Sequence, residues 1–365
     1  MNKLFIVLFP CIIALAILLA GGGPAPKTRF PVDSVGFATT ARQMDSVMNR
    51  IFTIQGRKIL DAWKRNNVEK RTAWKVAVCP HDDYCYAGWL YPEVLQNIKA
   101  TTVILIGVAH KAKKFGLEDK IVFDDFDQWA EPYGPVTISA LREKIMNRLP
   151  SSTYMVHDSM HAVEHSLEAI IPVLQYYNRK VEIIPILVPY MSFDRMTVIS
   201  SSLARALTQI MQDQDLDWRR DIAIVISTDA VHYGDEEWGG QNYAPYGCDS
   251  SGYNLALAHE HEIINNCLIG SLSTEKIRRF ARYTVQDTNY RTYKWTWCGR
   301  YSVPFGLLTA CYLEQNLRAN PARGMLLGYG NSIMQQPIPV QDLGMGKTAV
   351  ANMHHWVGYA AIGYK

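Results

Sequence analysis

Short runs of aliphatic and β-branched residues alternate along the chain with longer segments in which apolar residues recur at helical spacing. The short runs predict buried strands at 75–79, 101–107, 181–188 and 222–227. The longer segments predict helices at 38–67, 136–148, 162–177, 196–212 and 254–269. This alternation is typical of a layered α/β sandwich, in which helices cover both faces of a central sheet that is mostly parallel or mixed.

The N-terminal segment has a different pattern. Lys3 precedes an unbroken apolar run over 4–20, and "GGGPAPK" follows it. This order matches a secretory signal peptide, and the length of the run also reaches the lower limit for a membrane-spanning helix. We therefore expect residues 1–23 to be a signal peptide or an N-terminal membrane anchor. Either interpretation places the protein outside the cytoplasm, periplasmic or secreted, and the second tethers it to the membrane. We expect 24–37 to be an extended linker and 38–365 to be one domain.

Composition narrows the class of protein. The chain is 48% hydrophobic with a formal net charge of +3, and its basic residues are scattered among nearly as many acidic ones. Nucleic-acid binding needs a concentrated basic face, so we expect no nucleic-acid partner. No CxxC spacing occurs among the cysteines, which argues against a zinc ribbon and leaves any disulfide pairing unassigned. Outside the apolar N-terminal run, the cysteines are Cys79, Cys85, Cys248, Cys267, Cys298 and Cys311.

Three predicted strands lead into a histidine. His81 and His110 follow the first two strands closely, and His232 lies a few residues beyond the strand at 222–227. Parallel strands would bring these side chains to one edge of the sheet. Imidazole binds transition metals, and its ordinary pKa near 6.5 suits proton transfer at physiological pH. The pattern predicts a site with three metal ligands, or with two ligands and one acid/base group.

Two further residues are candidates for this site. Asp229 precedes His232 by three residues, and it either orients that imidazole or caps the turn after the strand. Cys298 lies in "KWTWCGR", beside Arg300. A cysteine binds metal as the thiolate, although an isolated cysteine is more often a small buried apolar residue.

A competing cluster is "HAVEH", in which His161, Glu164 and His165 fit the H-x-x-E-H pattern of inverted zinc peptidases. Such a motif requires one helix to present both histidines. We assign no functional site to two other histidine-rich stretches. We interpret "AHEHE" (258–262) as solvated helix surface, and we leave the adjacent His354 and His355 out of any site.

The motifs together resemble the Memo family, also called AmmeMemoRadiSam system protein B. They are "PHDDYCYAG" (80–88), "IGVAH" (106–110), "EHSLEAIIPVLQ" (164–175), "VEIIPILV" (181–188), "STDAVHYG" (227–234) and "CGR" (298–300). The resemblance covers roughly 75–313 and implies the fold of class III extradiol dioxygenases, which hold non-haem iron with two histidines and a carboxylate. It implies metal ligands at His81, His110 and Cys298, and an acid/base at His232 with Asp229 beside it. It also assigns the 164–168 segment to the fold around the site.

This chain departs from the family pattern at Asp82 and Asp83, where the family has small residues, so the charge of the site is expected to differ. Cysteine in place of the carboxylate favours a softer metal than in the dioxygenases. Our first hypothesis is an oxygen-dependent metalloprotein that uses iron or copper, with zinc as a third choice. The alternatives are a non-catalytic module that binds a small molecule or peptide in the same pocket, and a metal-dependent hydrolase.

Overall fold

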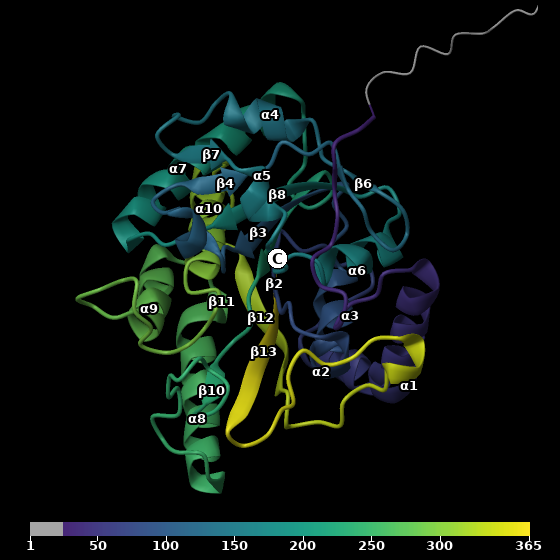
Figure 1. The fold of residues 1–365 in the computed structure, drawn as a ribbon. Helices are drawn as coiled ribbons and strands as arrows, with labels where there is room; N and C mark the ends of the chain where they lie inside the picture. Colours follow the sequence, from purple (N-terminus) through teal and green to yellow (C-terminus); the bar gives the residue numbers. More distant parts are fainter. Residues whose placement is uncertain (1–24) are drawn as a thin grey trace, which may run out of the picture.

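The computed structural model describes residues 25–365, which form a mixed sheet flanked by helices (Figure 1). Nine strands follow one path in the order β11-β12-β13-β2-β9-β3-β8-β4-β7, and β10 pairs with β13 beside it. The strand bounds are β2 Val76–Cys79, β3 Thr102–Val108, β4 Ile121–Phe123, β7 Tyr154–Val156, β8 Glu182–Val188, β9 Ile222–Ser227, β10 His232–Gly234, β11 Gly270–Ser271, β12 Arg323–Asn331 and β13 His355–Tyr364. The predicted α/β sandwich is confirmed, with a sheet that is mixed.

The centre of the sheet is parallel. Strand β9 pairs in parallel with both β2 and β3, and β3 pairs in parallel with β8. All four predicted strands are present to within one residue at each end. Their β-branched residues are buried on both faces, because alternate side chains enter two separate hydrophobic cores. In β3, for example, Leu105 packs in one core and Ile106 in the other.

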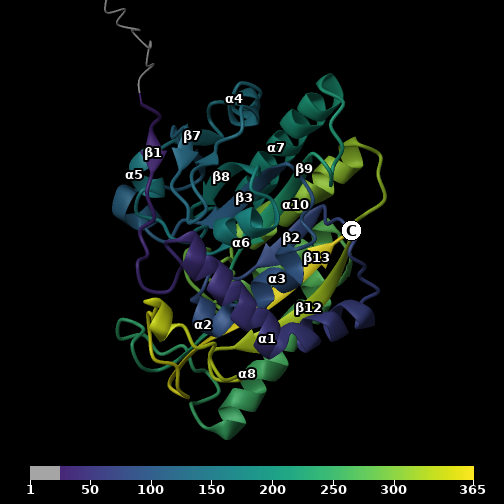
Figure 2. The ribbon, with the colours of Figure 1, turned by 90° about the vertical axis from the view of Figure 1, so that its right-hand side faces the viewer.

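Helices cover the two faces of the sheet (Figure 2). One face carries α1 (Ala41–Arg65), α3 (Leu90–Leu95) and α6 (Ile170–Tyr177). The other carries α7 (Phe193–Asp213), which packs closely on α10 (Ser302–Asn316), and α10 contacts β9 and β3 directly. Helix α1 begins with a capping box, in which the Thr40 hydroxyl accepts from the Gln43 amide.

Two predicted helices begin later than expected. In the 136–148 segment, Val136–Thr137 forms strand β6 and only Leu141–Met146 forms helix α4. The β-branched start of that segment favours a strand, and Ile138 also bridges to β8. In the 162–177 segment the helix begins at Ile170, because 162–169 forms turns that pass the ends of the strands.

The segment expected to be a linker is extended but partly packed. Thr28–Arg29 forms strand β1, which pairs with Gln128–Trp129 (β5) in a small second sheet with β6. The buried Arg29 side chain forms an ion pair with Glu168. The predicted signal peptide or anchor lies outside the described residues. Within 25–365, no helix combines the length and the hydropathy needed to cross a bilayer.

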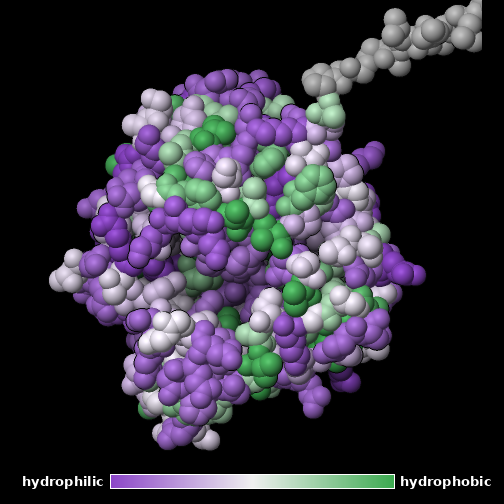
Figure 3. Space-filling model, viewed as in Figure 1, coloured by the Kyte–Doolittle hydropathy of each residue, from purple (hydrophilic) through white to green (hydrophobic). Residues whose placement is uncertain are grey.

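On the face shown in Figure 3, hydrophilic residues cover most of the area and the hydrophobic ones do not form one broad patch. All six cysteines of residues 25–365 are free, so the pairing that the sequence left unassigned is absent from this part of the chain.

Candidate metal centre

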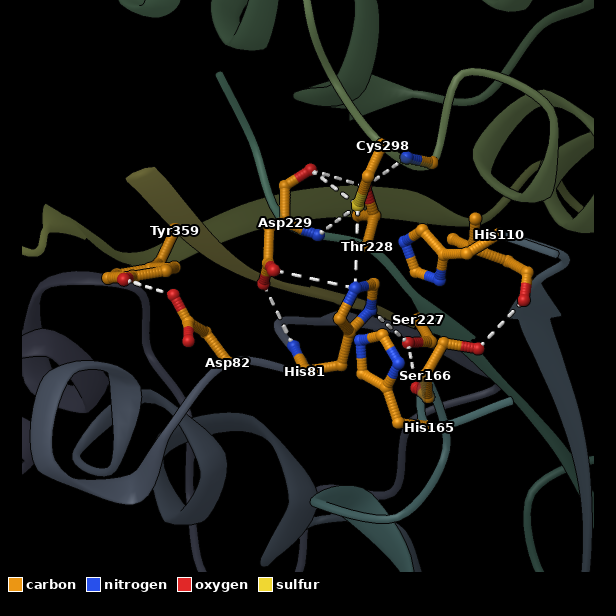
Figure 4. Close-up of polar contacts among 12 residues, drawn as sticks. His81, Asp82, His110, His165, Ser166, Ser227, Thr228, Asp229, Cys298 and Tyr359 are labelled. Carbon is orange, nitrogen blue, oxygen red and sulfur yellow. Dashed lines mark hydrogen bonds and ion pairs between the residues drawn. The ribbon is translucent and has the colours of Figure 1, made fainter. Parts of the chain in front are cut away.

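The strand-end histidines converge as the parallel arrangement requires (Figure 4). His81 follows β2 and His110 follows β3, and β9 lies between these two strands. The ring centroids of His81 and His110 are 5.3 Å apart. His232 begins β10, just beyond the end of β9. His81 and His110 therefore follow two of three adjacent parallel strands, and His232 lies shortly beyond the third, at the start of β10, which pairs antiparallel with β13.

Cys298 joins this group from the loop before α10. One ligand atom from each of His81, His110 and Cys298 lies within 4.8 Å of the other two, and Cys298 Sγ is 3.5 Å from His81 Nε2. Gly299 permits this approach, since a Cβ at that position would lie 2.2 Å from Thr228 Oγ1. The Asp229 amide donates to Cys298 Sγ at 3.0 Å, but burial outweighs this contact and raises the pKa of the thiol, so a bound cation would have to displace its proton.

Hydrogen bonds fix the tautomer of His81. The Ser227 hydroxyl donates to the Ser166 carbonyl, so it accepts from His81 Nδ1–H at 2.7 Å. The lone pair of His81 Nε2 then faces Cys298 Sγ and, at 3.4 Å, Asp229 Oδ2. Burial lowers the pKa of His81 well below its ordinary value, which keeps the ring neutral. A neutral imidazole whose Nε2 lone pair faces a thiol and a carboxyl group is the arrangement of a metal-binding site, in which the cation replaces their protons.

The Glu164 carboxylate fixes the orientation of His110 by accepting hydrogen bonds from it. The carboxylate accepts from His110 Nδ1 at 2.8 Å and from the His110 amide at 2.7 Å. The amides of His165 and Ser166 donate to the same carboxylate at 3.1 and 3.0 Å. Burial acts to raise the pKa of Glu164, but His110 and these hydrogen bonds outweigh it and lower the pKa to about 2. The carboxylate thus leaves His110 Nε2 free to bind a metal.

The sequence did not place His165 in this site. Its ring stacks on His110 with a centroid distance of 4.8 Å and meets the edge of His81 at 5.7 Å. His161, in contrast, ends the short helix α5 (Asp158–His161) and its Nε2 contacts the Val122 carbonyl. No helix of the described chain presents His161 and His165 together, so the interpretation as an inverted zinc-peptidase motif is wrong. The sequence did contain one indication of the turn between these histidines, the polar triplet "EHS" inside an otherwise helical pattern.

His232 and Asp229 lie on the other side of the group. A ligand atom of each lies within 4.8 Å of Cys298 Sγ. His232 Nε2 is buried without a hydrogen-bond partner, and burial lowers the pKa of His232 to about 3. Asp229 Oδ1 accepts from the His81 amide at 3.0 Å, so Asp229 is hydrogen-bonded to His81 rather than to His232. Burial raises the pKa of Asp229 to about 7.

These residues open into a cavity of about 390 Å³. Asp82 and Asp83 both line it, as expected from their replacement of small residues in the family pattern. Asp82 accepts from the Tyr359 hydroxyl, and Asp83 accepts from the Thr348 amide at 2.6 Å. The other walls include aromatic side chains and a histidine that the sequence analysis left out, namely Phe37, Tyr86, Trp238 and His355.

A buried glutamate supports the centre from helix α8 (Ser250–Ile263). Glu260 is fully buried, so the interpretation of "AHEHE" as solvated surface is wrong at this position. Its carboxylate accepts from the Trp295 and Trp297 indoles at 2.6 and 2.7 Å, and from the Val231 amide at 3.2 Å. Glu260 therefore links the segment before Cys298 to the segment before His232.

Comparison with known proteins agrees with this geometry. A family model described as "Memo-like protein" matches residues 42–337. A MEMO1 family protein of Aquifex aeolicus is 33% identical over 162 residues, which are 44% of this chain and 54% of that protein. A MEMO1 family protein of Thermotoga petrophila is 32% identical over 164 residues, which are again 44% of this chain and 54% of that protein. A MEMO1 family protein of Thermococcus kodakarensis is 23% identical over 214 residues, which are 56% of this chain and 66% of that protein. The matched region spans about half the length of the first two relatives.

Proposed function

Because the chain belongs to the family of Memo-like proteins, we propose that it is a metalloprotein that oxidises a small molecule in the cavity. His81, His110 and Cys298 hold the metal. The observation that carries this proposal is the convergence of two imidazole Nε2 atoms and one sulfur within 4.8 Å of one another, with both Nδ1 atoms occupied by hydrogen bonds that point Nε2 into the site. A set of two imidazoles and one thiolate suits iron or copper, and zinc next. When bound, such a metal supplies redox or Lewis-acid chemistry.

Other side chains of the cavity serve in proton transfer or in substrate binding. His232 offers a buried, unpartnered Nε2 that accepts a hydrogen bond from a bound substrate. Because burial lowers the pKa of His232 to about 3, it takes the proton only as negative charge develops on the substrate and raises that pKa. Asp229 holds the His81 backbone and faces the same space. Burial raises the pKa of Asp82 and of Asp83 to about 7, and an anionic ligand beside them would raise both further, so the pair disfavours an anion. A neutral or cationic aromatic molecule fits these walls better.

Metal analysis of the purified full-length chain tests the ligand assignment. We expect His81→Ala and Cys298→Ala each to lower bound iron or copper at least tenfold, because each removes one of three ligands. His261→Ala, which changes an exposed histidine of α8, is the matched control and is expected to keep the wild-type content. Unchanged metal in both ligand variants would refute the assignment.

A second measurement separates an enzyme from a binding module that uses the same cavity. Oxygen uptake with catechol, a neutral aromatic electron donor, is followed for the wild type and for His232→Ala at matched metal content. A proton-transfer role predicts a decrease of about 10²-fold or more in the variant. Equal oxygen uptake by the two proteins, or none by either, would instead favour the non-catalytic module.

A further inference from the structure

A second cluster of metal-binding side chains lies on the loop that follows β10. Asp235 Oδ1 is 2.7 Å from His354 Nδ1 and 3.2 Å from Cys248 Sγ. One ligand atom from each of the three residues lies within 4.8 Å of the other two. None of the three lines the central cavity, and none belongs to the His81 group. Residues far apart in sequence thus bring a thiol, an imidazole and a carboxylate to one point.

We propose that Asp235, Cys248 and His354 form a second metal site, which binds zinc and fastens one wall of the cavity. Thiolate, imidazole and carboxylate are the three side-chain ligand types that zinc takes in proteins. Ligand atoms around a tetrahedral zinc lie about 3.3–3.8 Å apart, given bond lengths of about 2.0–2.3 Å. The cluster is therefore close to the required spacing. Its exposure leaves the fourth position to water, and binding releases the thiol proton to solvent.

The position of the cluster explains what a metal would do there. The loop between Asp235 and Cys248 carries Trp238, which lines the cavity and stacks on His355 with a centroid distance of 4.0 Å. His355 directly follows His354, and its Nδ1 contacts the Glu236 carbonyl at 3.1 Å. A metal bound by Asp235, Cys248 and His354 would tie the loop to the start of β13. Trp238 would then be held over His232, whose ring lies 5.2 Å away.

Cobalt substitution distinguishes this site from the central one. Thiolate ligands give cobalt(II) a charge-transfer absorption. The full-length Cys298→Ser variant, which lacks the thiol of the central site, is therefore freed of metal and titrated with cobalt(II). We expect about one equivalent to produce the band, and zinc to abolish it by displacement. Adding Cys248→Ser or His354→Ala should remove it, whereas adding Cys311→Ala, at a buried cysteine of α10, should not.

Protection of the loop gives a readout that does not depend on the spectrum. In the Cys298→Ser background, zinc should slow proteolysis within 235–248 by about tenfold, and Cys248→Ser should abolish this effect. Thermal unfolding curves confirm that each variant is folded before it is compared. A band that survives Cys248→Ser and His354→Ala, or a loop that zinc leaves equally sensitive, would overturn the proposal. Neither outcome bears on metal binding by His81 and His110.

Discussion

Glu164 accepts four hydrogen bonds around His110 and, as a carboxylate, has no proton to donate. A glutamine at this position must turn its amide hydrogens toward at least one of the same donors. We expect Glu164→Gln to weaken metal binding by about 10–100-fold, because His110 would lose its fixed orientation. Competition with a chromophoric chelator measures the affinity. The exposed Glu143→Gln is the control, and equal affinities in the two variants would contradict the role of Glu164.

The proposed ligand residues differ in how far the sequence alone could predict them. His81 and His110 each end a strongly apolar run, so their positions follow from local pattern alone. Cys298 was only a candidate ligand until the family resemblance supported it, since its loop shows no periodicity. His165 was assigned to the wrong cluster, because its approach to His110 depends on turns at 162–169 that long-range bonds to Glu164 define. Local spacing does not record such bonds.

At the scale of elements, Glu260 joins α8 by hydrogen bonds to the segment before His232 and to the segment before Cys298. We expect Glu260→Gln to lower the free energy of unfolding by about 1–3 kcal/mol, since a buried amide cannot accept from both indoles and the Val231 amide without opposing a donor. Chemical denaturation measures this loss. Because Val231 and Trp297 adjoin His232 and Cys298, metal affinity should fall in the same variant.

Glu262→Gln is the matched control for this prediction. It lies two residues further along the same stretch of α8, but its side chain is about half exposed. We expect a change of less than about 0.5 kcal/mol there. Equal losses of stability at Glu260 and Glu262 would show that the buried carboxylate has no special function.

The elements were predictable to different degrees. The four parallel strands agree with the pattern because they are buried on both faces, which leaves an uninterrupted apolar run. Strand β12 was harder to predict, since glycines interrupt its apolar pattern. The delayed start of α6 had one local signal, the polar triplet at 164–166, which lies in the turns before the helix.

At the scale of the molecule, stability should depend on pH through Glu93 of α3. Both carboxylate oxygens are buried without partners, and burial raises the pKa of Glu93 to about 8. A raised folded-state pKa means that the folded chain keeps this proton while the unfolded chain loses it above about 4.5. The contribution to stability is therefore largest at low pH and is lost between about pH 4.5 and 8.

Glu93→Gln isolates this effect, because a neutral side chain of similar shape does not titrate. The free energy of unfolding of the wild type should fall relative to the variant as the pH rises, by at most about 5 kcal/mol over that range. Urea denaturation of both proteins at pH 5.5, 7 and 8.5 measures the divergence. Parallel stability profiles would show that Glu93 is ionised in the folded chain.

Strand β13 lies inside the sheet between β12 and β2, and all ten of its residues are buried. It is also translated after every other strand described, including those that lead into His81, His110 and His232. A nascent chain on the ribosome therefore carries both histidine ligands while β2 still presents an unpaired edge. That edge stays unpaired until β13 has emerged from the ribosome, so it is open to misassociation throughout synthesis.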